Sequence, residues 1–212
     1  MTTDLSAAGT AGGVPVLGVP TDSIVTVVPY AELPAPLGAD LAAKVGRLGY
    51  LGGFFGLMAH QPDALLHFNR FTEALKDALP GELSEVVALT AAATAGNDYE
   101  LVQHIRLARS HGKTDGWISA AAFGEADGGQ LLAPAEWDVR ALSRAALTGA
   151  PADAELQAVV TALGEPIAVA VLLLLGRYVA HAVVGRVLRL QAPVTLDPPL
   201  DRNRNAPPRR TP

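Results

Sequence analysis

The feature that most constrains the fold is a series of helix-breaking dipeptides at regular intervals through the middle of the chain. They are Gln61-Pro62, Pro80-Gly81, Gly96-Asn97 and Gly112-Lys113. Proline disrupts a continuing helix because it lacks an amide donor, and glycine accepts the left-handed conformation that often ends one. No strand-like segment alternates with the intervening stretches, so a mixed α/β sheet is disfavoured. The pattern predicts an all-α chain whose short connections join antiparallel neighbouring helices.

The segments between these breaks favour helices by composition as well. Half of the residues are hydrophobic, and alanine and leucine, both strong helix formers, dominate among them. We therefore expect a bundle of about seven or eight helices. The stretch GYLGGFFGLM (49–58) is either a loosened helix or a close-packed turn. The expected helices span residues 37–50, 61–79, 82–95, 98–111, 114–122, 135–148, 152–163 and 166–190.

The two ends of the chain differ from its middle. Residues 1–30 are predicted to be a flexible N-terminal arm, residues 31–197 a single helical domain, and residues 198–212 a disordered tail. The arginines at the far end either touch an anionic surface or are simply solvated. The stretch EADGGQ (125–130) is predicted to be a flexible connector.

Composition excludes several classes of function. The chain has no cysteine, which excludes disulfides, thiolate catalysis and cysteine-bound metal clusters. Its net charge of −5 comes without a basic patch, so we expect no nucleic-acid partner. The most apolar run, IAVAVLLLL (167–175), is shorter than the roughly 20 residues that span a bilayer. The start lacks the pattern of a signal peptide. We therefore predict a buried core helix, no membrane partner and a cytoplasmic location.

The segment 98–111 carries an unusual set of side chains for a chain with five histidines. Glu100 and His104 are four residues apart, and His111 follows seven residues later, so all three share one edge of the predicted helix, beside its buried face. Such an edge suits either a site or ordinary helix capping. In the second interpretation Asn97 caps the helix, Glu100 completes a capping box and His111 complements the carboxyl end.

The spacing of four residues in this region resembles a known family. The redox members of the carboxymuconolactone decarboxylase and alkyl hydroperoxidase D superfamily show Glu-x11-Cys-x2-Cys-x3-His. This sequence reads Glu85-x11-Asn97-x2-Glu100-x3-His104, so every spacing matches while both cysteines are replaced. The Tyr-Glu-x-x-x-His pattern that begins at Tyr99 is similar to the cysteine-free branch of the superfamily.

Three longer stretches agree with this resemblance, which covers roughly residues 30–197. Residues 48–75 are similar to the upstream helices of the family, residues 82–104 to its core hairpin and residues 172–190 to its closing helix. The resemblance implies an alkyl hydroperoxidase D-like helical bundle that assembles as a homo-oligomer.

The chemistry implied by the resemblance depends on which motif residues survive. Peroxide reduction needs the cysteine pair, so thiol peroxidase activity is disfavoured. Glu85, Glu100 and His104 remain as candidate catalytic residues for proton transfer. We therefore expect a cofactor-free acid–base enzyme of the decarboxylase, or lyase, type, acting on a small organic acid, lactone or oxygenated metabolite. The alternative is a non-catalytic helical oligomer that binds a small molecule or a partner. Glu85 also suits the first turn of a helix, where the dipole favours carboxylates.

Four further residues are candidates for substrate binding. Tyr99 supplies a pocket hydroxyl or is a buried aromatic residue, and Asn97 lines the pocket or caps the helix. In the helix 61–79, His67 and Arg70 share a face. Arg70 either holds a substrate carboxylate or pairs with Glu73 or Glu32.

The remaining polar residues leave alternatives open. Arg177, Tyr178 and His181 follow the most apolar segment, and polar groups that enter a buried helix need partners. They reach the same pocket, a subunit interface or a satisfied polar network. Glu100, His104 and His67 have ligand atoms suited to a metal, but no two-ligand spacing supports such a site. We expect no metal.

Overall fold

The computed structural model describes residues 13–124 and 131–200, and within them it confirms the predicted all-α, alkyl hydroperoxidase D-like bundle. Nine α-helices occur in this part of the chain, one more than the upper expectation, together with a short 3-10 turn (η1, Tyr30–Glu32) and two very short strands. The helices are α1 (Ala35–Leu48), α2 (Gly53–Met58), α3 (Pro62–Ala78), α4 (Gly81–Thr94), α5 (Asp98–Ser110), α6 (Asp115–Phe123), α7 (Pro134–Thr148), α8 (Asp153–Leu163) and α9 (Glu165–Val187).

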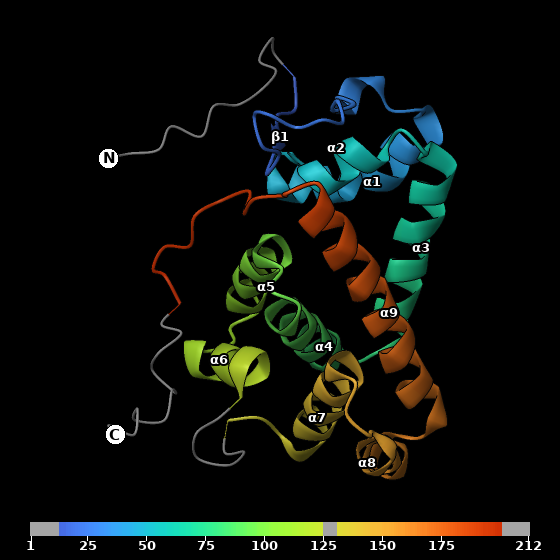
Figure 1. Ribbon diagram of the computed structural model, residues 1–212, viewed down its shortest axis with the longest axis vertical. Coiled ribbons are helices and arrows are strands. Elements are labelled where there is room, and N and C mark those ends of the chain that lie inside the picture. Colours follow the sequence, from blue (N-terminus) through green and yellow to red (C-terminus); the bar gives the residue numbers. More distant parts are fainter. Residues whose placement is uncertain (1–12, 125–130, 201–212) are drawn as a thin grey trace. The chain divides into compact units, whose positions relative to one another are not determined.

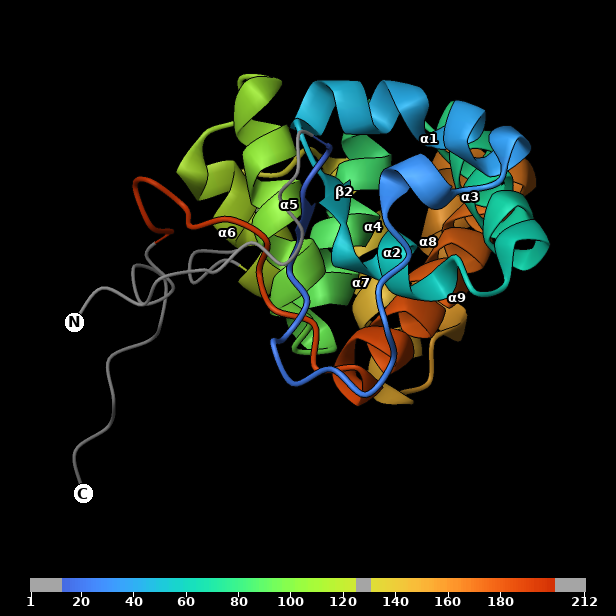
Figure 2. The same ribbon diagram turned by 90° about the horizontal axis from the view of Figure 1, so that it is seen from above.

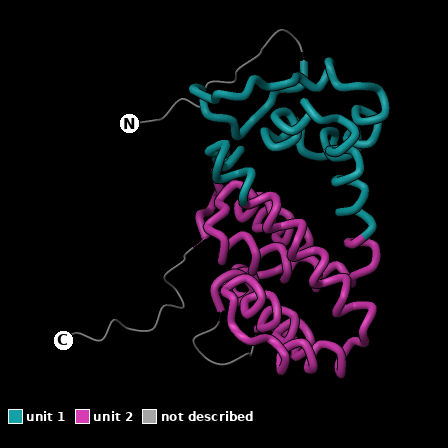
Figure 3. Tube along the Cα trace, turned by 45° about the vertical axis from the view of Figure 1, so that its right-hand side comes forward, with its two compact units in different colours: residues 1–74, 183–194 teal, residues 75–182, 195–212 magenta. Residues whose placement is uncertain are grey.

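The chain divides into two compact units (Figure 3). Unit 1 comprises residues 1–74 and 183–194, and unit 2 comprises residues 75–182 and 195–212. Two of the three divisions fall inside α3 and α9, so each of these helices contributes to both units. The predicted connector 125–130 and most of the predicted tail lie outside the described residues. The domain boundaries at residues 31 and 197 stay a prediction.

The additional helix lies in the glycine-rich stretch of unit 1. Strand β1 (Val16–Leu17) pairs in parallel with β2 (Leu51–Gly52), and β2 leads directly into α2 (Figure 2). A Cβ atom at Gly53 would stand 2.6 Å from a methyl carbon of Val19. Glycine is therefore required where the helix begins, because the backbone approaches a neighbouring segment closely.

Helix α4 is the central element of unit 2, where it contacts α5, α6 and α7 (Figure 1). Its sequence lacks a polar face, and the ten residues from Leu83 to Ala92 are all buried. A helix that is apolar on every side is stable only when other helices surround it. The core that forms around it contains mainly alanine, valine and leucine side chains from α4 to α9.

Helix α9 is long and apolar enough, by length and composition, to cross a membrane, with a mean hydropathy of 2.1 in its most apolar window. It nevertheless carries buried polar residues, Arg177 and His181, on the side that packs in unit 2. Both contact Glu100 of α5, which identifies this side as part of a protein core. The helix ends three residues before its predicted end, and Arg189 beyond it adopts a positive φ of 54°.

Candidate functional site

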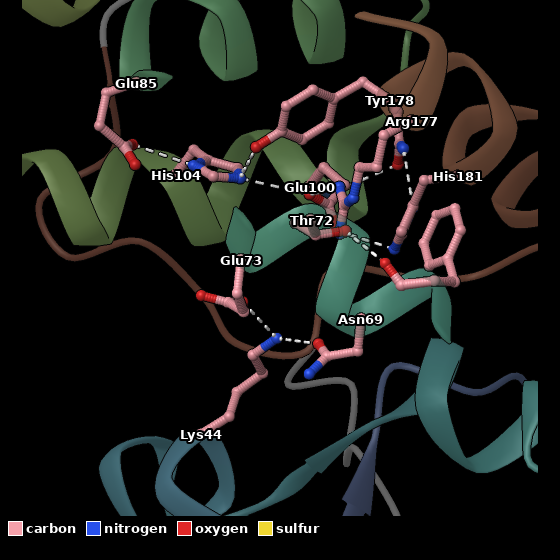
Figure 4. A network of polar contacts seen from close by, with 12 residues as sticks. Lys44, Asn69, Thr72, Glu73, Glu85, Glu100, His104, Arg177, Tyr178 and His181 are labelled. Carbon is pink, nitrogen blue, oxygen red and sulfur yellow. Dashed lines mark hydrogen bonds and ion pairs between the residues drawn. The ribbon is translucent and has the colours of Figure 1, made fainter. Parts of the chain in front are cut away.

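Two adjoining helices of unit 2 bring a carboxylate and an imidazole into direct contact (Figure 4). Glu85 lies near the start of α4, and His104 lies in the middle of α5. The Oε2 atom of Glu85 is 2.9 Å from Nδ1 of His104, and both side chains are buried. The helices run from one into the other through the turn at Gly96, which has a positive φ of 63°. This tight turn places the two residues side by side although 19 positions separate them.

Glu100 lies one turn before His104 on α5 and is the most highly connected residue of the site. Its Oε2 atom is 3.3 Å from Nε2 of His104 and 3.2 Å from Nη1 of Arg177. Its Oε1 atom accepts a 2.8 Å hydrogen bond from Nε2 of His181. One carboxylate therefore joins two histidines and an arginine.

Helix α9 supplies the remaining members, Arg177, Tyr178 and His181. Residues three or four apart on a helix share a face, which directs Arg177, Tyr178 and His181 toward α5. The hydroxyl of Tyr178 is 3.0 Å from Nε2 of His104, and the two rings meet edge to face. Of the three interpretations left open by the sequence, the network within unit 2 is the one seen here. The signal for it was the presence of polar residues immediately after an apolar run.

Asn97 and Tyr99 support this network from the start of α5. The side chain of Asn97 accepts a 3.3 Å hydrogen bond from the amide of Glu100, as a helix cap does. The amide nitrogen of the same side chain lies 3.4 Å from Nδ1 of His181, and the Tyr99 ring stacks on the His181 ring. The capping box is incomplete, because the backbone N–H of Asn97 donates to Ala92 and the Glu100 carboxylate faces His104 and α9.

The electrostatics of the Glu85–His104 pair favour the doubly charged state. Burial by itself raises the pKa of Glu85, but the attraction and hydrogen bond of His104 outweigh it and lower that pKa. Burial likewise lowers the pKa of His104, but the attraction of Glu85 and the hydrogen bonds of Glu100 and Glu85 outweigh it and raise that pKa. His104 is therefore poised to hold a proton at near-neutral pH.

Glu100 and His181 have a different balance. Burial raises the pKa of Glu100, but the attraction of Arg177 and the hydrogen bonds from both histidines hold it well below its ordinary value. Burial lowers the pKa of His181 despite the attraction of Glu100, so His181 is neutral. A neutral ring explains its contacts, since Nε2–H donates to Glu100 while Nδ1 faces the amide of Asn97. Two carboxylates and two cations then leave the site with no net charge.

The sequence prediction placed Glu100 and His104 at the margin between a buried and an exposed face, and the structure corrects this. Only 5% of Glu100 and 7% of His104 is exposed. The margin is covered because residues of α9 pack over it, a contact that helical periodicity within α5 cannot reveal. His111 does lie at the exposed end of α5, as its C-cap.

The two candidates from α3 belong to unit 1. Arg70 donates a 3.0 Å hydrogen bond from Nε to Asp40 of α1, instead of pairing with either glutamate considered from the sequence. Asp40 also accepts from Asn69, whose carbonyl accepts from Lys44 (Figure 4). His67 is exposed on the same helix. A role for Arg70 and His67 in substrate binding stays a prediction.

Two further observations concern ligand sites. Within residues 13–124 and 131–200, no group of three or more His, Asp or Glu side chains is arranged to hold a metal ion. A cavity of about 280 Å³ lies within unit 1, lined by residues 16–21, 23, 25–27 and 191–193. None of the predicted site residues lines this cavity.

Part of the chain matches a known protein family. Residues 62–146 match the carboxymuconolactone decarboxylase family, a region that includes Glu85, Glu100 and His104. The predicted resemblance to the carboxymuconolactone decarboxylase and alkyl hydroperoxidase D superfamily is therefore confirmed. No curated protein matches the chain in sequence.

Three solved structures are similar to this chain in fold. The apo debrominase Bmp8 is 16% identical, with a TM-score of 0.71 over 82% of this chain and 94% of that one. A Cys-to-Ala variant of Bmp8 bound to 2,3,4-tribromopyrrole, also 16% identical, has a TM-score of 0.70 over 81% of this chain and 92% of that one. A protein of unknown function from Agrobacterium tumefaciens, a candidate antioxidant defence protein AhpD, is 17% identical, with a TM-score of 0.57 over 65% of this chain and 96% of that one.

Proposed function

We propose that this protein is a cofactor-free acid–base enzyme of the carboxymuconolactone decarboxylase type, acting on a small organic acid, lactone or oxygenated metabolite. The observation that carries the proposal is the buried 2.9 Å contact between Glu85 and His104 within the region that matches the family. A histidine held beside a carboxylate is a proton donor and acceptor with a pKa matched to near-neutral pH. In the proposal His104 transfers the proton, and Glu85 and Glu100 stabilise its charged form.

The proposed step is a decarboxylation with proton transfer. The imidazolium of His104 gives its Nε2 proton to the substrate carbon that gains an electron pair when its C–C bond to a carboxylate breaks. Carbon dioxide leaves, a new C–H bond forms, and neutral His104 keeps its Nδ1–H donated to Glu85. A proton from water then restores the imidazolium. Nε2 is the reacting atom in this scheme because Nδ1 already contacts Glu85.

The substrate must reach Nε2 through the contacts that now cover it. Tyr178 and Glu100 both lie at this nitrogen, 3.0 and 3.3 Å away. In the proposal the substrate atom takes the place of the Tyr178 hydroxyl, which moves aside with its side chain. The Bmp8 variant that binds a tribromopyrrole supports a small molecule as the ligand of this fold. Because the chain has no cysteine, the proposal includes no thiolate step.

The proposal also covers the location of the enzyme, its assembly and its substrate-binding residues. We propose that the protein acts in the cytoplasm and that it assembles as a homo-oligomer, the second of which the resemblance to the family implies. Asn97, Tyr99, Arg70 and His67 are proposed to contribute to substrate binding. The first two have the closer support, because they already touch the network around Glu100.

The test is turnover of 4-carboxymuconolactone and related unsaturated lactone acids in deuterated water. The wild-type protein is expected to release carbon dioxide and to place one deuterium in the product. His104→Gln is expected to lower turnover at least about 100-fold, the usual contribution of general acid–base catalysis. Glu82→Gln is the matched control, since Glu82 lies in the first turn of α4 but pairs with Lys113 near the surface. Equal turnover by wild type and a folded His104→Gln would overturn the assignment.

One observation favours the alternative of a non-catalytic helical protein. The charged groups of the site already form a neutral, fully buried network, which by itself suits a structural role. NMR of the histidine rings separates the two possibilities without depending on turnover. Binding of 4-carboxymuconolactone to an enzyme site is expected to shift the His104 signals, whereas a structural network leaves them unchanged at saturating ligand.

A further inference from the structure

Helix α9 has a second face, opposite in character to the one that enters the site. Its exposed residues between the two charged ends are all non-polar, and several are large: Val169 is 53% exposed, Leu173 46% and Val183 44%. We define the apolar face of α9 as Val169, Leu172, Leu173, Gly176, Val179, Ala180 and Val183. With 100° per residue these positions lie within about 120° of one another, so they form one continuous stripe.

This stripe differs from ordinary surface apolar residues. Single exposed leucines or valines need no explanation, but a contiguous row that extends along a helix marks an interaction surface. The row covers four turns without a charged or hydrogen-bonding side chain. The same helix uses its polar residues on the opposite side, where Arg177 and His181 meet Glu100. The sequence of α9 therefore requires a partner on each side.

The charges at the ends of the stripe indicate which partner fits. Glu165 begins the helix, and Arg186 lies one residue before its end; both are exposed. Their midpoint in the sequence falls at residues 175 and 176. If a second copy of α9 lies antiparallel across Gly176, Glu165 of each copy meets the region of Arg186 in the other. Two ion pairs then close the two ends of one symmetric contact.

Side-chain size is complementary in the same arrangement. Across a two-fold axis at Gly176, Val169 faces Val183 of the second copy, and the large Leu172 faces the small Ala180. Gly176 itself lets the two backbones approach closely, and a Cβ atom there would meet nothing within 4 Å in the single chain. A membrane surface explains these features less well, since a helix that lies on a bilayer is rich in Lys and Arg on the face opposite its apolar one, whereas that side of α9 packs in the hydrophobic core.

We infer that the apolar face of α9 binds the same face of a second copy of this chain, in an antiparallel pair centred on Gly176. This specifies one surface of the proposed homo-oligomer and does not depend on the proposed reaction. Assembly and turnover are measured separately, so a negative result for the dimer does not contradict the proposed reaction, and a negative result for the reaction does not contradict the dimer.

The absence of cysteines makes the arrangement directly testable. Gly176→Cys in the full chain is expected to form a disulfide-linked dimer under mild oxidation, because the two thiols meet near the axis. Val169→Cys is not expected to do so, since about 14 residues of rise, roughly 21 Å, separate the two copies of that position. Gln157→Cys on the exposed side of α8 serves as a control for random collision. Cross-linking by Val169→Cys as efficient as that by Gly176→Cys would overturn the antiparallel arrangement.

Charge reversal tests the ends of the stripe in solution. Glu165→Arg is expected to weaken self-association at least tenfold in sedimentation equilibrium, because two arginines then face each other. Adding Arg186→Glu is expected to restore it. Leu172→Lys should weaken association more strongly, whereas Leu131→Lys, at another exposed leucine, should not. A monomeric wild-type protein, or one that instead binds phosphatidylcholine–phosphatidylserine vesicles through Leu172, would overturn the inference.

Discussion

His104 shows how much depends on the surroundings of a single residue. Its two ring nitrogens face two different carboxylates, at 2.9 Å for Glu85 and 3.3 Å for Glu100. Isolated in a dry interior, an imidazole would lose its proton; between two carboxylates it keeps one, and its pKa is raised. The protonation state of the site is therefore a property of three residues together.

The contribution of Glu85 can be isolated with Glu85→Gln. Glutamine keeps the shape and still accepts a hydrogen bond from Nδ1 of His104, but it removes the negative charge. We expect the pKa of His104 to fall, measured by NMR titration of its ring signals. Glu82→Gln, one turn earlier on α4, should leave that pKa unchanged. An unaltered pKa in Glu85→Gln would contradict the electrostatic role given to Glu85.

The raised pKa of His104 also predicts how stability depends on pH. A group whose pKa is higher in the folded state stabilises the fold fully below its unfolded pKa, near 6.5, and loses this effect as the pH rises through the folded value. Urea unfolding of the wild type is therefore expected to show decreasing stability above pH 6.5. His104→Gln, which cannot be protonated, should lack this decrease. The lowered pKa of Glu85 has a corresponding effect in acid. Its ionised form stabilises the fold fully above the ordinary value of 4.5, and this contribution is lost as the pH falls through the folded value.

At the scale of elements, Arg177 is the charged residue that α9 contributes to the site. Arg177 is 7% exposed and pairs with Glu100, 77 positions earlier in the chain. Its guanidinium balances part of the negative charge that α4 and α5 bring into the interior. Removing one member of a buried pair leaves the other charge without compensation.

Arg177→Ala is therefore expected to lower the free energy of unfolding by about 3–5 kcal/mol. The matched control is Arg106→Ala, an exposed arginine on α5, for which a change within about 0.5 kcal/mol is expected. Both values come from urea denaturation at pH 7. Arg177→Met, which replaces the charge with an apolar chain of similar length, separates loss of packing from loss of charge. Equal effects of the two alanine variants would contradict the charge argument.

At the scale of the whole molecule, the core of unit 2 is organised around α4. Every residue from Leu83 to Ala92 is buried, whereas α8 has a single buried residue, Val159. Backbone amides of a central helix exchange only when most of the surrounding structure opens. The site shares this environment because Glu85 is part of α4.

Native-state hydrogen exchange is expected to show this difference directly. The amides of α4 should exchange most slowly among the helices of unit 2, and those of α8 much faster. Leu89→Ala, at a fully buried position, should accelerate exchange throughout α4 and cost about 2–5 kcal/mol. Exchange in α4 as fast as in α8 would show that α4 is not the central element of this core.

Much of the fold follows from local patterns in the sequence. Helix limits were predicted to within a few residues because proline, glycine and capping residues act on their immediate neighbours. Glu85 and His104 were placed together by the spacing of a family motif, and the turn between their helices is short. Local patterns do not decide whether residues 49–58 form a helix or a turn. The six-residue α2 forms there, and only the close approach of Val19 explains the need for glycine at its start.

The sequence by itself determined the helices, the absence of thiol chemistry and the motif that joins α4 to α5, since each depends on residue type and on neighbours along the chain. Only the tertiary structure decided that Glu100 and His104 are buried, that Arg177, Tyr178 and His181 complete their network, and that Arg70 pairs with Asp40. These contacts join positions 30 to 81 residues apart. No local rule specifies them, because they depend on how whole helices pack.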